Sequence, residues 1–209
     1  MYKWINETML RWEEDEKMLW KATVLHHPMW GKWYPDFSNI VLNFLPMLQD
    51  HKFDVYLNGH EHVISYAHYL YAQVPHSYAH QAFADYFEAQ QEMDIFESHV
   101  LKEYNCESGQ ESFFGNDPAV RTLRMKKGEA LHQITTGTSG FDEYLLCLSR
   151  PSMGTFTYAQ NIIHGWSSVH VDERELRIVS KGVDPTSNEV VKLYELVIEN
   201  DAHAEVFEQ

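Results

Sequence analysis

The spacing of apolar positions predicts three helices separated by short strands. Residues 2–18 hold large apolar side chains at helical spacing among many acids, with no Gly or Pro, which predicts an amphipathic helix. A second helix is predicted over residues 38–51, with a bend at Pro46. Residues 76–104 again lack Gly and Pro, and their aromatic residues recur near one face. We therefore predict a long third helix that begins after Pro75.

Short apolar or alternating segments predict strands, and turn residues end several of them. The first strand stops at His26-His27-Pro28, and the second is broken by Asn58-Gly59. The order of strand, helix and strand, followed by a run of antiparallel strands, indicates an α/β layered domain. The predicted strands are residues 22–25, 53–57, 63–71, 131–135, 165–171, 175–180 and 190–198.

The charge balance excludes one class of partner. The 209 residues contain 31 acidic and 16 basic side chains, a formal net charge of −15, whereas nucleic-acid binding needs a basic face. A hydrophobic content of 44% is enough to build a core. No apolar stretch has the roughly 18 to 20 residues of a membrane span, so neither a transmembrane helix nor a signal peptide is predicted. Two cysteines are too few for a disulfide framework or a thiolate zinc site.

Of the 13 histidines, four directly follow the first two predicted strands: His26, His27, His60 and His62. The carboxyl ends of neighbouring strands in an open α/β sheet converge on one ligand site. Residues i and i+2 of an extended segment point the same way, so His60 and His62 are expected to face one site, with Gly59 allowing a tight turn. Neutral imidazoles suit zinc, iron and copper. A single histidine is more often an ordinary core or surface residue, which is the prediction for all the others.

Several catalytic motifs are absent from the sequence. It contains no phosphate-binding Gly-x-x-x-x-Gly-Lys-Ser/Thr loop, no Gly-x-Ser-x-Gly, no His-Glu-x-x-His and no Cys-x-x-Cys. Residues 137–140 form a small-residue turn that either passes close to a bound group or only turns the chain. The second interpretation is favoured because nothing beside the turn supplies a catalytic pair.

Four motifs, in this order, resemble those of one enzyme superfamily. Residues 24–30 resemble a strand followed by His-x-Pro-x-Trp, and residues 56–62 resemble a strand followed by Gly-His-x-His. Residues 136–140 resemble a Ser-Gly-x-Gly turn, and residues 165–171 resemble the strand that opens a closing hairpin. The chain thus resembles the carboxy-terminal half of the calcineurin-like metallophosphoesterases, in particular the purple acid phosphatases of the tartrate-resistant type. Residues 72–128 would be a helical insertion.

This resemblance implies a four-layer αββα sandwich and a site with two metal ions, iron paired with iron, zinc or manganese. Carried over by motif, His26 and His60 would bind the second, divalent metal, and His62 would bind the first, ferric one. The residues implied to lie beside the metals or the substrate, without binding metal, are His27, Asn58 and Gly59.

The resemblance also identifies family features that these residues lack. The metal-bridging Asp, the tyrosinate and the Asn-His pair of the family have no counterpart in the sequence, and residues 31–36 lack the further His expected after the first motif. Three imidazoles without a bridging carboxylate would neutralise two adjacent dications poorly. The two-metal centre is therefore not expected to assemble in this chain alone.

The expected function is half of a phosphoesterase that hydrolyses phosphate monoesters with a metal-bound hydroxide. Its partner would be the amino-terminal half of the phosphatase, on the same gene product or on a separate chain. The alternative is a catalytically inactive phosphatase-fold subunit with a structural role, and a weaker one is a mononuclear three-imidazole zinc site. Half a sandwich exposes a strand edge, so the isolated chain is expected to aggregate or dimerise. A secretory or lysosomal location is implied if the complete protein carries a signal.

Overall fold

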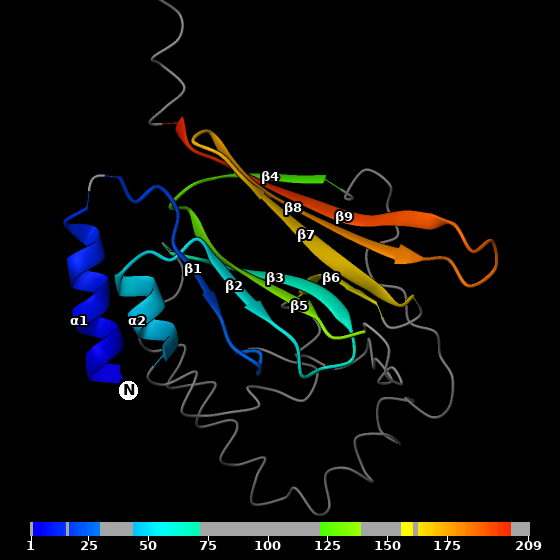
Figure 1. The fold of residues 1–209 in the computed structure, drawn as a ribbon, viewed down its shortest axis with the longest axis horizontal. Coiled ribbons are helices and arrows are strands. Elements are labelled where there is room, and N and C mark those ends of the chain that lie inside the picture. Colours follow the sequence, from blue (N-terminus) through cyan, green and yellow to red (C-terminus); the bar gives the residue numbers. More distant parts are fainter. Residues whose placement is uncertain are drawn as a thin grey trace, which may run out of the picture.

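Two β-sheets and two helices make up the described part of the chain (Figure 1). The predicted helix over 76–104 lies outside the described residues. Residues 72–121 of the predicted insertion lie outside them too. Both stay predictions. The computed structural model describes residues 2–15, 17–29, 44–71, 122–138, 156–160 and 163–201.

A five-stranded sheet contains the two strands that the histidines follow. Its first three strands are parallel and its last two are antiparallel to their neighbours. Val55 and Tyr56 of the second strand are both buried, as expected for a parallel strand that is covered on both faces. In spatial order the strands are β1 (Ala22–Val24), β2 (Val55–Asn58), β5 (Ala130–Thr136), β3 (Ile64–Leu70) and β6 (Phe156–Gln160).

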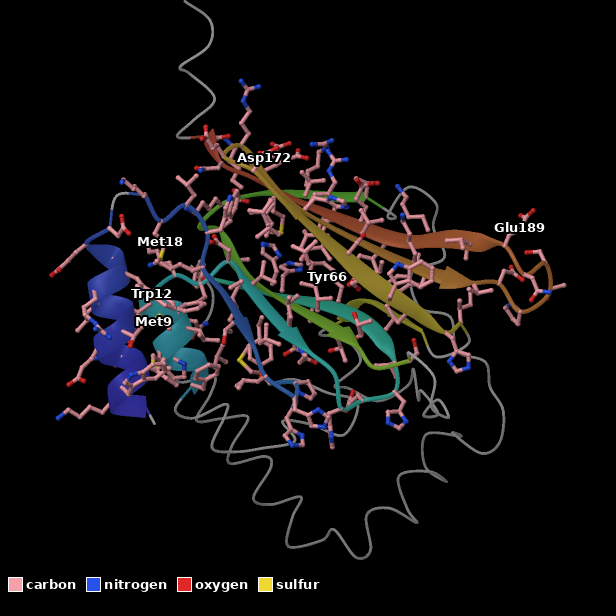
Figure 2. The ribbon with its side chains drawn as sticks, viewed as in Figure 1. Met9, Trp12, Met18, Tyr66, Asp172 and Glu189 are labelled. Atoms are coloured by element: carbon pink, nitrogen blue, oxygen red, sulfur yellow. The ribbon has the colours of Figure 1, made fainter. Side chains whose placement is uncertain are left out.

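A four-stranded sheet packs against the first one. Its third strand alternates buried Leu176 and Ile178 with half-buried residues, which is typical of a strand with one face on a core. Tyr66 of β3 lies between the sheets, where its ring stacks on Tyr194 with centroids 5.8 Å apart (Figure 2). In spatial order the strands are β4 (Thr122–Lys126), β9 (Val190–Glu199), β8 (Glu175–Val183) and β7 (Gly165–Val171).

Both described helices, α1 (Tyr2–Glu13) and α2 (Leu45–Asp50), pack on the five-stranded sheet (Figure 1). Met9 and Leu48 of the helices form a second core with Tyr56 and Leu131 of the sheet. The described part is thus a mixed α/β structure of three layers, and the fourth layer of the expected αββα sandwich stays a prediction. Neither described helix is long and apolar enough to cross a membrane.

All seven predicted strands are confirmed as β1, β2, β3, β5, β7, β8 and β9, with small shifts at their ends. The predicted bend at Pro46 stays a prediction, because residues 38–43 of that helix lie outside the described part. The described helix begins at Leu45, so Pro46 lies in its first turn, where a missing N–H leaves no bond unmade. The first helix ends at Glu13, earlier than predicted. Strands β4 and β6 were not predicted.

Candidate metal site

Two parallel strands bring histidines together at one end of the five-stranded sheet. β1 and β2 pair with Val24 opposite Leu57, and the N–H of Leu25 continues the ladder to the carbonyl of Leu57 at 3.1 Å. The N–H of Gly59 then donates to the carbonyl of His26 at 3.1 Å, which holds the two strand ends together. Parallel pairing therefore places the residues after both strands at the same edge, as the sequence predicts.

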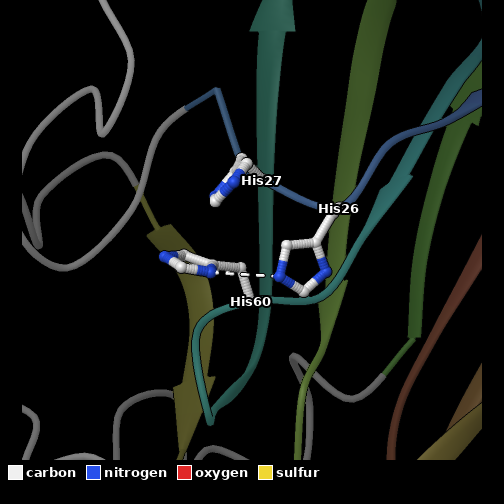
Figure 3. Close-up of side chains that lie close together, drawn as sticks. All are labelled: His26, His27 and His60. Carbon is white, nitrogen blue, oxygen red and sulfur yellow. Dashed lines mark hydrogen bonds between the residues drawn. The ribbon is translucent and has the colours of Figure 1, made fainter.

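His26, His27 and His60 form a cluster at this edge (Figure 3). The His26 Nε2 and His60 Nδ1 atoms are 3.2 Å apart. The ring centroids of His27 and His60 are 4.0 Å apart, and those of His26 and His27 are 4.8 Å apart. One ring nitrogen from each residue lies within 4.8 Å of the other two. We call these three residues the histidine cluster.

The backbone around His27 is fixed by buried contacts. The Tyr56 hydroxyl donates to the His27 carbonyl, and the Met29 N–H donates to Gln133 Oε1 at 3.1 Å. Pro28 lies between them and is buried, as is Met29. His27 is half-buried, whereas His26 before it is exposed. This segment therefore has little freedom to carry the His27 ring away from His60.

In the loop that follows β2, the backbone of His60 has a left-handed conformation, with a φ of 60°. Gly59 is not among the described residues with positive φ, and the tight turn expected at this glycine stays a prediction. A left-handed non-glycine residue costs roughly 1 kcal/mol or more and is often found at functional sites. Because residues 60–63 are bends rather than an extended strand, the alternation that predicted His60 and His62 on one side does not apply.

Gly137 supports the loop from behind. Its N–H donates to the Val63 carbonyl at 3.0 Å. A Cβ at this position would lie only 1.7 Å from the carbonyl oxygen of Glu61, so only glycine fits there. The small-residue turn predicted after β5 therefore packs directly against the loop that carries His60. Sequence reasoning treated this turn as a chain reversal and missed its contact with the site, although the four-motif resemblance included it.

Burial and neighbouring rings favour neutral imidazoles in the cluster. Burial lowers the pKa of His27, and the nearby His26 adds to the effect. The pKa of His60 is lowered by burial and then by His27, His26 and His62. A neutral imidazole offers a lone pair, which is the form that binds a metal ion.

The other predicted site residues lie near the cluster but outside it. His62 is close enough to affect the pKa of His60, yet the cluster found among the described residues does not include it. Asn58 is buried, and its Oδ1 accepts a hydrogen bond from Thr135 Oγ1 at 2.7 Å, which links β2 to β5. Its Nδ2 has no hydrogen-bond partner among the described residues. The roles predicted for His26, His27, His60, His62, Asn58 and Gly59 all stay predictions.

The donor atoms decide which metal centre fits. Three imidazoles are an established ligand set for one borderline divalent ion with an open coordination position. No carboxylate belongs to the cluster formed by the described residues. Hard ferric ions and bridged metal pairs favour carboxylate oxygen, so these residues fit a single divalent metal and do not complete a two-metal centre.

The fold is similar to that of a solved purple acid phosphatase. The purple acid phosphatase PPD1 from seeds of yellow lupin, Lupinus luteus, matches with a TM-score of 0.52 and 10% identity, over 95% of this chain and 28% of that chain. GAP50, the anchor in the inner membrane complex of Plasmodium, matches with a TM-score of 0.49 and 12% identity, over 92% of this chain and 41% of that chain. The chain thus spans less than half the length of either protein.

Comparison by sequence finds no matching protein-family model and no matching curated protein. At 10% identity the likeness to the lupin enzyme shows the fold alone. The chain has a mixed α/β, metallophosphoesterase-like fold.

Proposed function

We propose that this chain supplies the histidine ligands of a metal centre in a protein that hydrolyses phosphate monoesters. The observation that carries the proposal is the 3.2 Å approach of His26 Nε2 to His60 Nδ1 at the carboxyl ends of two neighbouring parallel strands. Ligand sites of open α/β sheets lie at such strand ends. The metallophosphoesterase-like fold adds support for phosphate esters as the substrate class.

In the proposed centre, His26 and His60 hold a divalent metal, and His62 holds a ferric ion. Two such metals supply electrostatic stabilisation for both the attacking and the leaving oxygen of an in-line displacement. The metals proposed are iron with iron, zinc or manganese. This chain's own contribution is to orient the imidazoles, which the Gly59–His26 backbone bond and the Gly137 contact do.

The carboxylate ligands are proposed to come from outside the described residues, on an amino-terminal segment or on a partner chain. Two observations support this. The histidine cluster contains no carboxylate among the described residues. The chain also matches only 28% of the lupin phosphatase, so most of that enzyme has no counterpart in it.

The experiment is to purify the native assembly from its source and to identify every chain that co-purifies. Iron, zinc and manganese are then measured per mole of this chain, together with hydrolysis of p-nitrophenyl phosphate. We expect two metals per chain, with iron among them, and metal-dependent hydrolysis. An assembly that lacks both metal and hydrolysis would favour the alternative, a phosphatase-fold subunit with a structural role.

Variants of the same assembly locate the activity in this site. His60→Ala should reduce hydrolysis by roughly 100-fold or more, because a metal ligand is lost. His170→Ala is the matched control, since His170 is exposed on β7 of the other sheet and should leave the rate unchanged. Equal effects of the two substitutions would contradict the proposal.

A further inference from the structure

The position of His27 differs from the role that the family resemblance implies. That role puts His27 beside the metals and makes His62 a ligand. In the structure the His27 ring lies 4.0 Å from the His60 ring and belongs to the histidine cluster, whereas His62 does not. We infer that His26, His27 and His60 form a mononuclear site for a divalent metal, with His27 as a direct ligand, which this chain holds without a partner.

This inference rests on the same site as the proposed function and concerns the single metal ion that this chain can bind alone. It does not need the carboxylates that the two-metal proposal requires from elsewhere. Its test uses this chain and a metal alone, so it can fail while phosphatase activity of the native assembly stands. Conversely, the chain can bind one metal ion while the native assembly shows no phosphatase activity.

The distance between two of the donor atoms is already that of a metal site. Imidazole nitrogens bind zinc at about 2.0 to 2.1 Å, so two nitrogens on one tetrahedral ion lie about 3.3 Å apart. His26 Nε2 and His60 Nδ1 are 3.2 Å apart. A single ion can therefore contact both atoms with almost no movement of either ring.

The third donor needs a small adjustment. The widest separation in the cluster is up to 4.8 Å. Reaching the tetrahedral spacing requires about 1.5 Å of movement. Because His26 and His60 are already 3.2 Å apart, the wider separations in the cluster involve His27. Rotation of the His27 imidazole about its side-chain torsions, with its backbone held in place, closes the site on the ion.

The backbone already positions His27 and His60. The Tyr56 hydroxyl holds the His27 carbonyl, and Gly137 packs against the Glu61 carbonyl directly after His60. The left-handed backbone of His60 is a strained conformation, and such strain is more common at functional sites than in ordinary loops. Fixed ligands reduce the entropy lost when the metal binds, so they raise its affinity.

The ion that best fits three imidazoles is Zn²⁺, and its fourth position would stay open to water or to an anionic ligand. Co²⁺ is a suitable probe, because it takes the same tetrahedral sites and its visible spectrum reports the coordination geometry. A thiolate ligand to Co²⁺ adds a charge-transfer band, which identifies a direct ligand at the position of a cysteine substitution.

The experiment titrates the full 209-residue chain, freed of metal with a chelator, with Zn²⁺ and with Co²⁺. We expect one metal per chain and a tetrahedral Co²⁺ spectrum. His26→Ala, His27→Ala and His60→Ala should each weaken binding by roughly 100-fold or more. His62→Ala separates this ligand set from the one that the resemblance implies, because His62 is a ligand only in the latter. His170→Ala, on β7 of the other sheet, is the matched control and should leave the affinity unchanged.

His27→Cys and His62→Cys separate a ligand from a residue that only supports the fold. His27→Cys should keep the metal and add a thiolate charge-transfer band to the Co²⁺ spectrum, whereas His62→Cys should add none. Circular dichroism and thermal unfolding of each metal-free variant show whether it folds. The inference is overturned if the chain binds no metal, if His62→Ala removes binding while His27→Ala does not, or if the thiolate band appears only at position 62.

Discussion

At the scale of single residues, His132 carries the strongest electrostatic penalty of the described histidines. It lies on β5 between the sheets and is fully buried. Its Nδ1 is 2.9 Å from the Tyr66 hydroxyl, and its Nε2 has no hydrogen-bond partner among the described residues. Burial, followed by the nearby His68, lowers the pKa of His132 from 6.5 to about 3. The imidazole is therefore neutral in the folded protein.

This lowered pKa predicts that His132 destabilises the fold in acid. The unfolded chain takes up a proton below pH 6.5, whereas the folded chain does so only near pH 3, so stability falls as the pH drops through this window. The contribution lost between pH 7 and pH 5 is about 2 kcal/mol. His132→Gln removes the titrating group and keeps a polar side chain beside Tyr66. Urea unfolding at both pH values should show a smaller loss in this variant.

The comparison between variant and wild type isolates His132 from groups that act in the opposite direction. Burial raises the pKa of Asp54 to about 6, so ionised Asp54 weakens the fold above that pH, and acidification relieves the penalty. Asp54 is present in both proteins, so its contribution to the pH dependence cancels when the two are compared. The exposed His170→Gln is the control. An identical pH dependence in the wild type and His132→Gln would contradict the buried, neutral assignment.

The sequence predicts part of the candidate site at this scale and misses another part. The positions of His26 and His60 follow from two strand ends, and parallel pairing of β1 and β2 does bring them together. His27 belongs to the cluster and His62 does not, in a loop where His60 has a left-handed backbone and Gly137 packs against Glu61. Residue spacing carries no information about that backbone conformation or that contact.

At the scale of elements, the contact between the turn after β5 and the loop after β2 controls the site. A Cβ at Gly137 would be 1.7 Å from the Glu61 carbonyl oxygen and 2.7 Å from its carbon. Both are backbone atoms, so Gly137→Ala must push the two segments apart. We expect this substitution to lower the free energy of unfolding by about 2 to 4 kcal/mol. It should also weaken metal binding, because His60 moves with its loop.

Gly59→Ala is the matched control for this prediction. A Cβ at Gly59 would meet only the Thr136 carbonyl oxygen, at an ordinary 3.9 Å. Its effect on the free energy of unfolding should stay within about 1 kcal/mol. Thermal or urea unfolding of both variants measures the difference, and equal losses of stability would show that the contact at Gly137 is unimportant.

The elements that the sequence predicts are those with strong local patterns. The apolar runs of β1 and β2 and the alternation of β8 are visible in a few residues each. β4 is a five-residue strand with Arg and Lys in it, and it pairs with β9, which lies about seventy residues later in the chain. Its structure comes from that distant partner rather than from its own composition. Pro46 lies in the first turn of the described helix, a position that tolerates proline.

At the scale of the whole molecule, β1 forms one edge of the five-stranded sheet. Among the described residues no further strand pairs with β1, and Val24 is 71% exposed and Leu25 37% exposed. In the described part this edge therefore combines open backbone with apolar side chains. Such edges pair readily with another strand. We therefore predict that the isolated chain self-associates through β1. Val24→Lys should shift sedimentation velocity profiles toward the monomer, because a charge on the edge opposes pairing.

Val183→Lys is the control for this prediction. Val183 of β8 is 39% exposed, but it pairs with Val190 of β9 on one side and donates its N–H to the His164 carbonyl on the other. The same charge there should leave the association unchanged. A wild-type chain that sediments as a monomer at all concentrations would contradict the prediction, and so would an equal response to both substitutions.

The sequence predicts the class of the fold correctly, since a mixed α/β structure with a metallophosphoesterase-like arrangement is observed. The strand order within each sheet could not be obtained from it. β5 inserts between β2 and β3, although these two are consecutive in the chain. That insertion is decided by the burial of β5 on both faces, which is a property of the assembled molecule.

The strand pairs also differ in how far apart in the chain their paired residues lie. β7, β8 and β9 are consecutive antiparallel strands joined by short turns. The histidine cluster instead joins residues 34 apart, and the link from Asn58 to Thr135 joins residues 77 apart. Contacts between distant residues form more slowly, because a long loop must close first. We expect β7–β9 to assemble early in folding and the histidines to meet late. Metal affinity during refolding would then report the last step at which the native topology is completed.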